Sequence, residues 1–268
     1  MAQATKTNGF LKAAVADLQM ASCFLTRLPV GWPKDPDGNW CQRPLADTVW
    51  SYPLVGVLLG LLLAPVLWLA TSLGLPELAT GILAVIALVL LTGALHEDGL
   101  ADVADGFGGA FERERKLEIM KDSLIGSYGA VALVLITILK ASLIGALSQK
   151  LDLQSLILSL VSVFALSRGT MPLLMLILPY ARSSGLASSA QTPTRQRTAL
   201  GLFLSLTIAF LLLGASPGGV VFLCVLATVA LIGFIAKKQI GGITGDVLGT
   251  AVKLSETVAL IALTGLAG

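Results

Sequence analysis

Four carboxylates in one short motif are the side chains of this chain whose types and spacing best suit chemistry. Residues 96–106 are HEDGLADVADG and include Glu97, Asp98, Asp102 and Asp105. Asp98, Asp102 and Asp105 share one face of a helix because they are spaced i, i+4 and i+7. Like charges at that spacing destabilise a helix by roughly 0.2–0.5 kcal/mol per pair unless a counter-charge is present. A hard divalent cation prefers carboxylate oxygens, so we predict that these four residues bind one.

The other residues around the motif narrow the chemistry. His96 is the only histidine, which excludes a zinc site built on several histidines; it is either a helix-end residue or a substrate contact. Glu112, Glu114 and Glu118 alternate with basic residues and are typical of an exposed helix face. The three cysteines have neither metal-binding nor disulfide spacing.

A second polar segment, residues 121–129, is KDSLIGSYG and precedes an apolar stretch. Helix N-termini with free N–H groups bind phosphate, so Lys121, Ser123 and Gly126 are candidate substrate contacts. Asp122 is a further candidate metal ligand. The alternative is a plain capped helix start.

A third polar segment, residues 241–249, is GGITGDVLG. Its glycines allow a close backbone approach, so Gly242, Thr244 and Gly245 are candidate substrate contacts. Asp246 is either a metal ligand or a helix N-cap.

Charged residues inside apolar stretches are functional candidates by default. Lys253 and Glu256 lie in the last apolar stretch and either contact substrate or pair with each other at i, i+3. Arg168 lies in an earlier stretch and either binds phosphate or neutralises a buried carboxylate.

The three polar segments together suit the metal-assisted handling of a phosphate or diphosphate substrate. Phosphoryl transfer needs little covalent chemistry from a protein. It needs cations to neutralise oxygens and groups that hold donor and acceptor in line.

The elements that must position these residues are membrane helices. Hydrophobic residues make up 55% of the chain and charged residues 13%, against about 25% charged in a soluble domain. A spanning helix needs about 20 apolar residues, so we predict an all-α, polytopic membrane bundle with six or seven spans. The bundle is one domain, 1–268, with an interfacial amphipathic helix at 10–30, a hairpin at 52–95, an acidic segment at 96–127, hairpins at 128–180 and 199–236, and a glycine-rich loop with the last helix at 241–267.

The distribution of basic residues predicts the orientation. With the N-terminus inside, 14 of the 18 Lys and Arg residues fall in the inside segments. The acidic segment 96–127 then faces the cytoplasm. The net charge of +2 indicates no nucleic-acid partner.

At these motifs the sequence resembles the cobalamin synthase family, also called adenosylcobinamide-GDP ribazoletransferase or cobalamin-5′-phosphate synthase. The resemblance rests on residues 96–106, 117–126 and 241–249, with weaker support from 24–29 and 52–56. These motifs are spread over nearly the whole chain. The acidic motif followed by Lys-Asp-Ser is highly specific.

The resemblance implies a bacterial or archaeal inner-membrane enzyme that uses magnesium. The donor would be adenosylcobinamide-GDP and the acceptor α-ribazole or its 5′-phosphate, with release of GMP. The family's acidic motif maps onto the four carboxylates already singled out. We assign catalysis to Asp98, Asp102 and Asp105, with Asp105 as the first choice of proton acceptor. The lower base, the preferred ribazole form and a homo-oligomer stay open.

One position departs from the family pattern. Members usually have arginine where this chain has Leu124, and leucine cannot bind a phosphate or a carboxylate. Either Lys121, Arg168 or a basic residue of 181–198 substitutes for it, or this copy of the enzyme is weakened.

Two other functions fit parts of the pattern. A CDP-alcohol phosphotransferase would use similar metal chemistry on a lipid, but the Ala-Arg of that family's signature is absent after Asp98-Gly99 and Asp105-Gly106. An ion-coupled transporter would bind ions on membrane carboxylates, but here the acids cluster outside the predicted spans. Release of GMP would separate the transferase from both.

Overall fold

The computed structural model of the chain describes residues 2–34, 38–40, 43–182 and 191–267, with side chains from residue 11 onwards. Within these ranges the regular elements are all helices, and the only bridges are the isolated pairs Lys34–Trp40 and Tyr180–Ile243. The elements are α1 (Ala2–Leu25), η1 (Leu45–Ser51), α2 (Tyr52–Leu62), α3 (Ala64–Ser72), α4 (Glu77–Thr92), α5 (Leu95–Gly109), α6 (Arg113–Ile119), α7 (Ser127–Lys150), α8 (Leu153–Thr170), α9 (Pro172–Ile177), α11 (Arg195–Leu213), α12 (Ala215–Ile240) and α13 (Gly245–Leu266).

The helices confirm an all-α, multi-pass membrane protein. Six helical stretches in the described part of the chain are long and apolar enough to cross a membrane: Leu45–Ser72, Ser127–Lys150, Leu153–Ile177, Arg195–Leu213, Ala215–Ile240 and Gly245–Leu266. The count rises to seven if the bent pair α4 and α5 forms one span. Both numbers lie within the predicted range.

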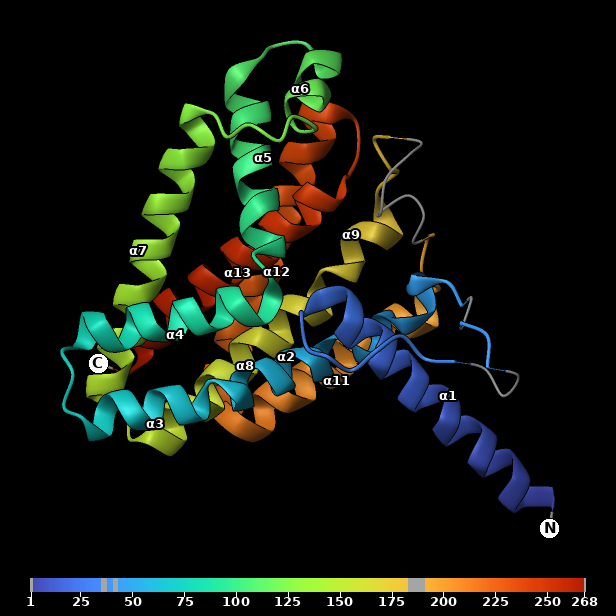
Figure 1. Cartoon of the computed structure of the whole chain (residues 1–268), viewed down its shortest axis with the longest axis horizontal. Coiled ribbons are helices and arrows are strands. Elements are labelled where there is room, and N and C mark those ends of the chain that lie inside the picture. Colours follow the sequence, from blue (N-terminus) through green and yellow to red (C-terminus); the bar gives the residue numbers. More distant parts are fainter. Residues whose placement is uncertain (1, 35–37, 41–42, 183–190, 268) are drawn as a thin grey trace.

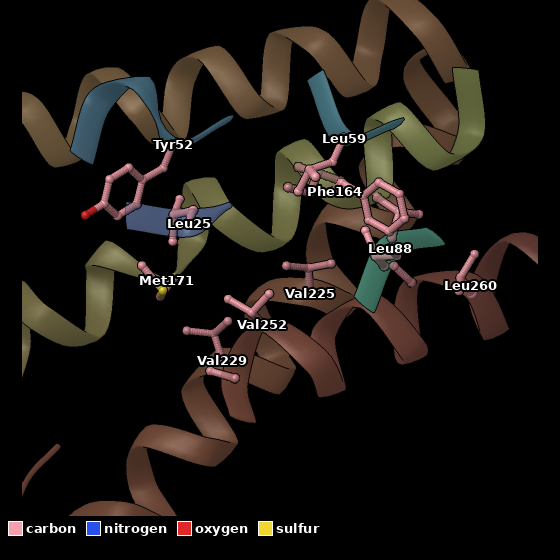
Figure 2. Close-up of a cluster of buried hydrophobic side chains, with 14 of the residues drawn as sticks. Leu25, Tyr52, Leu59, Leu88, Phe164, Met171, Val225, Val229, Val252 and Leu260 are labelled. Carbon is pink, nitrogen blue, oxygen red and sulfur yellow. The ribbon is translucent and has the colours of Figure 1, made fainter. Parts of the chain in front are cut away.

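Helix α8 lies at the centre of the bundle. In the most apolar stretch of Leu153–Ile177, which α8 forms together with α9, 83% of the residues are buried inside the protein, against 28% for α7. Helix α2 packs closely on α8, because a Cβ at Gly56 would lie 2.2 Å from the carbonyl oxygen of Phe164. Figure 2 shows the apolar core between these helices and α4, α12 and α13, with Leu59, Phe164, Leu88, Val225 and Leu260 among the labelled side chains.

A sharp bend directs the acidic motif away from α4. Gly93 and Ala94 have φ values of 64° and 58°, both left-handed, and the axes of α4 and α5 differ by 94°. In Figure 1, α5 therefore rises from the end of α4 and lies beside α13, with which it makes extensive contacts. The bend is what brings the acidic motif next to the third polar segment.

Some helix bounds differ from the predicted ones. The first helix runs from Ala2 to Leu25, whereas residues 10–30 were predicted; it ends early because Thr26 Oγ1 accepts the Leu28 N–H, and Pro29 follows. Figure 1 shows α1 extending away from the bundle. The predicted hairpin 199–236 is longer in the structure, Arg195 to Ile240, because polar residues continue both helices beyond their apolar stretches.

Candidate active site

The candidate site lies where α5 meets the start of α13. A Cβ at Gly99 would be 2.8 Å from the carbonyl oxygen of Asp246, so only glycine allows this approach. Thr250 Oγ1 donates a hydrogen bond of 3.0 Å to the carbonyl oxygen of Gly99. These contacts place the acidic face of α5 against the first turn of α13.

Three carboxylates gather there and form what we call the acidic cluster: Asp98 and Asp102 of α5, and Asp246 of α13. Asp98 is exposed, and the other two are half-buried. Helix α5 is not among the six helical stretches that are long enough to span the membrane by themselves. Burial, followed by the charges of Asp246 and Asp98, raises the pKa of Asp102 to about 7. The neighbouring carboxylates therefore lie close enough to oppose the ionisation of Asp102.

Arg182 is the basic residue at the acidic cluster. Its Nη1 lies 3.7 Å from Asp246 Oδ2, and its Nη2 donates a hydrogen bond of 2.8 Å to the carbonyl oxygen of Leu117. The sequence indicated only the range 181–198 as a source of basic side chains and did not single out this residue. Nothing in the local pattern marks Arg182, because its partners lie far away along the chain.

Asp105 has a different role from the other acids of its motif. Its Oδ2 accepts the N–H of Gly126 and its Oδ1 accepts the N–H of Gly129, both at 2.8 Å. Asp105 therefore caps the first turn of α7 from a neighbouring helix. Each of its oxygens accepts one backbone N–H, and its predicted roles as a metal ligand and proton acceptor stay predictions.

The rest of the second polar segment does not join the acidic cluster. Asp122 Oδ1 accepts the N–H of Leu124 at 3.1 Å in a local turn. Lys121, Ser123 and Gly126 are exposed, and Leu124 is 79% exposed. The segment includes a helix start that Asp105 caps, and its predicted contacts with substrate stay predictions.

The third polar segment is packed against the chain around residue 180. A Cβ at Gly242 would lie 2.1 Å from the carbonyl oxygen of Pro179, so this glycine serves a backbone contact. Thr244 caps α13: its Oγ1 accepts the Val247 N–H at 3.3 Å and donates to Asp246 Oδ2 at 3.0 Å. Gly245 is exposed beside the acidic cluster.

A second group of charges, which we call the buried ion network, lies deeper in the helix bundle than the acidic cluster. It consists of Glu97, Lys140, Arg168, Lys253 and Glu256, each at most 9% exposed. Glu256 binds Lys140 and, at 2.7 Å, Arg168 Nη1, while Glu97 binds Lys253. Lys253 Nζ is 3.8 Å from Glu256. Of the two interpretations of Arg168, the structure matches the neutralisation of a buried carboxylate.

The network changes the interpretation of several predicted contacts. Glu97 was predicted to bind a metal because no basic residue lies near it in sequence, yet Lys253 of α13 reaches it. His96, 3% exposed, packs beside the network, and its Nε2 has no hydrogen-bond partner among the described residues. Lys140 was missed as a partner, although a lysine inside a predicted span is itself a signal.

The acidic cluster contains the type of oxygen ligand that a divalent cation prefers. Within the described residues no three His, Cys, Asp or Glu side chains are already close enough to hold an ion. Asp98, Asp102 and Asp246 nevertheless supply oxygens from two facing helices. Burial, followed by the charges of the other two carboxylates, raises the pKa of Asp102, and a cation would favour its ionised form. Glu97 and Asp105 have other partners.

Comparison with known proteins agrees with these features. The chain matches the family described as cobalamin-5-phosphate synthase over residues 17–264. An adenosylcobinamide-GDP ribazoletransferase of Mesorhizobium japonicum is 40% identical over 91% of both chains. The adenosylcobinamide-GDP ribazoletransferase of Bradyrhizobium diazoefficiens is 39% identical over 94% of both chains. That of Brucella ovis is 42% identical over 90% of this chain and 93% of the relative.

No solved structure is significantly similar to this chain. The family match and the relatives each cover at least nine-tenths of the sequence, and the family match includes all three polar segments. The chain therefore belongs to the cobalamin-5-phosphate synthase family and is an enzyme, a transferase of cobalamin biosynthesis.

Proposed function

We propose that the protein joins adenosylcobinamide-GDP to α-ribazole or α-ribazole 5′-phosphate and releases GMP, with Mg²⁺ bound at the acidic cluster. The names of its relatives support the substrates. The observation that carries the proposal is the acidic cluster, in which three carboxylates from α5 and α13 lie near one another and one of them pairs with Arg182.

The reaction exchanges one P–O bond for another. A ribose hydroxyl of the acceptor attacks the phosphorus attached to cobinamide, and the diphosphate bond to GMP breaks. Bound Mg²⁺ would neutralise the diphosphate oxygens, with Asp98, Asp102 and Asp246 as its oxygen ligands.

The hydroxyl proton needs an acceptor, and we assign Asp102. Burial raises the pKa of Asp102 in the metal-free protein, and a cation bound beside it would favour the ionised form that accepts a proton. Asp105, which the sequence favoured for this step, already accepts two backbone N–H groups.

The proposed location is the bacterial inner membrane with the acidic cluster facing the cytoplasm. Arg182 pairs with Asp246 of the cluster, and Arg113 binds the neighbouring carbonyl oxygen of Ala181, so both lie on the side of the cluster, as the positive-inside rule expects. Ser123→Cys, in a variant whose native cysteines are replaced by serine, should react with a membrane-impermeant thiol reagent in inverted vesicles and not in spheroplasts. Ser72→Cys, on the opposite side, should show the reverse.

The activity is tested with purified protein in detergent or liposomes, given adenosylcobinamide-GDP, α-ribazole 5′-phosphate and Mg²⁺. We expect GMP and a corrinoid that has gained the base in equal amounts, and neither product in EDTA. If the wild-type chain is silent, Leu124→Arg is assayed in the same way. Silence of both proteins would refute the proposed reaction.

A further inference from the structure

Arg182 is held in place without using its full capacity to donate hydrogen bonds. Its side chain is 17% exposed, and Nη2 donates to the carbonyl oxygen of Leu117. Its Nη1 is 3.7 Å from Asp246 Oδ2, too long for a direct hydrogen bond. Its Nε is buried and has no partner among the described residues. A buried donor left unpaired is unfavourable, so the guanidinium can still donate a hydrogen bond to an anionic oxygen.

The backbone on both sides of the site fixes the position of this arginine. Ala181 N–H donates to the Ile243 carbonyl oxygen at 2.8 Å, and Ile243 N–H donates to that of Pro179 at 2.9 Å. The guanidinium of Arg113 binds the carbonyl oxygens of Ala181 and Ile240 at 2.9 and 2.8 Å. Arg182 therefore starts from a segment that is tied to both α6 and the loop before α13.

The other basic side chains of this region are engaged elsewhere. Arg113 binds backbone carbonyls, Lys116 binds Gln239 and Arg115 binds Glu118. Within the described residues, Arg182 is the only cation that forms an ion pair with the acidic cluster. A divalent cation arriving there would compete with Arg182 for the carboxylate of Asp246.

We propose that Arg182 is a substrate-binding residue whose guanidinium leaves Asp246 when the divalent cation binds and then binds a diphosphate oxygen of the nucleotide substrate. Arginine suits this exchange because its planar donors match phosphate as well as carboxylate oxygens. The inference rests on the proposed function, since it takes the nucleotide diphosphate as the ligand of the acidic cluster.

If Arg182 exchanges Asp246 for the nucleotide, removing Arg182 should affect the binding of the metal ion and of the nucleotide in opposite ways. Arg182→Ala removes a competitor of the cation, so Mn²⁺, measured by electron paramagnetic resonance without substrate, should bind as tightly as in wild type or several-fold tighter. With saturating metal, the same variant should raise KM for adenosylcobinamide-GDP tenfold or more. Its affinity for GDP, measured by calorimetry, should fall by a similar factor. Arg182→Lys should lie between, because it keeps the charge and loses the planar donors.

Arg115→Ala is the matched control. Within the described part of the chain Arg115 pairs only with Glu118 of the same helix, at 2.9 Å, and both side chains are 65% exposed. We expect wild-type values in all three measurements. Thermal unfolding of each variant checks the fold, and Arg182→Lys serves alone if the alanine variant does not fold.

Two results would overturn the proposal. A parallel loss of Mn²⁺ and GDP affinity would mean that Arg182 only supports the structure, and an unchanged KM and GDP affinity would mean that it does not contact the substrate. The metal and GDP measurements need no turnover. Absence of GMP in the wild type would therefore count against the proposed reaction and leave these two measurements to decide the role of Arg182.

Discussion

The buried ion network and the acidic cluster are neighbours on the same two helices, yet their charges are balanced in opposite ways. In the network, two carboxylates meet three cations, and each carboxylate is ion-paired. In the cluster, three carboxylates meet one arginine at 3.7 Å. Glu97 and Asp98 are adjacent in sequence, yet Glu97 belongs to the buried ion network and Asp98 to the acidic cluster.

The difference follows from access to water. A carboxylate in the bundle interior must be paired, because desolvating an isolated charge costs several kcal/mol. Asp98, which is exposed, keeps its solvation and can stay unpaired. The network thus joins the helices, while the cluster keeps free oxygens for a ligand.

The largest effect is expected from breaking the network. Glu256→Gln leaves Lys140 and Arg168 buried without their carboxylate, since Glu256 is 0% exposed. We expect a loss of about 3–5 kcal/mol in stability, measured by thermal unfolding in detergent. Glu118→Gln, which removes an exposed pair, should leave Tm unchanged. Equal Tm values for the two variants would contradict a stabilising network.

Removing a carboxylate of the acidic cluster should lower activity strongly without lowering stability. Asp102→Asn should lower GMP release about 10²–10³-fold, a loss typical of one electrostatic group in an active site. Its Tm should stay level or rise, because a like charge disappears. Near-normal turnover in Asp102→Asn and in Asp98→Asn would remove the basis of the proposed site.

Asp105 lies on the same helix as the cluster but should behave as a structural residue. Asp105→Ala leaves the N–H groups of Gly126 and Gly129 without their acceptor, and we expect a loss of about 1–2 kcal/mol, typical of a helix cap. Asp122→Ala, at an exposed turn, is the control. A stability loss as large in the control would argue against the specific cap.

The smallest effect should come from adding the cation. At ten times its dissociation constant, Mg²⁺ should stabilise the wild type by about 1.4 kcal/mol. The resulting shift of Tm should be absent in Asp102→Asn and retained in Glu118→Gln. A shift of equal size in all three proteins would point to binding away from the cluster.

The sequence predicted the helices and the acidic motif because both are local patterns. Apolar runs of membrane length and the i, i+4, i+7 spacing need no knowledge of the fold. The partners of the charges could not be found in this way. Lys140 and Glu256 are 116 positions apart, and Lys253 reaches Glu97 only because the bend after α4 turns α5 onto α13. The four carboxylates of the motif therefore looked like one site. In the structure Glu97 pairs with Lys253 and Asp105 caps α7, while Asp98 and Asp102 belong to the acidic cluster.

The cap that Asp105 places on α7 also bears on the order in which ligands bind. The positive end of a helix macrodipole attracts anions, and two helices begin near the site. Asp105 occupies the start of α7, and Asp246 lies in the first turn of α13. Both helix starts are thus already matched with negative charge and would repel a free diphosphate. We expect an ordered mechanism in which the metal ion enters first and the nucleotide second.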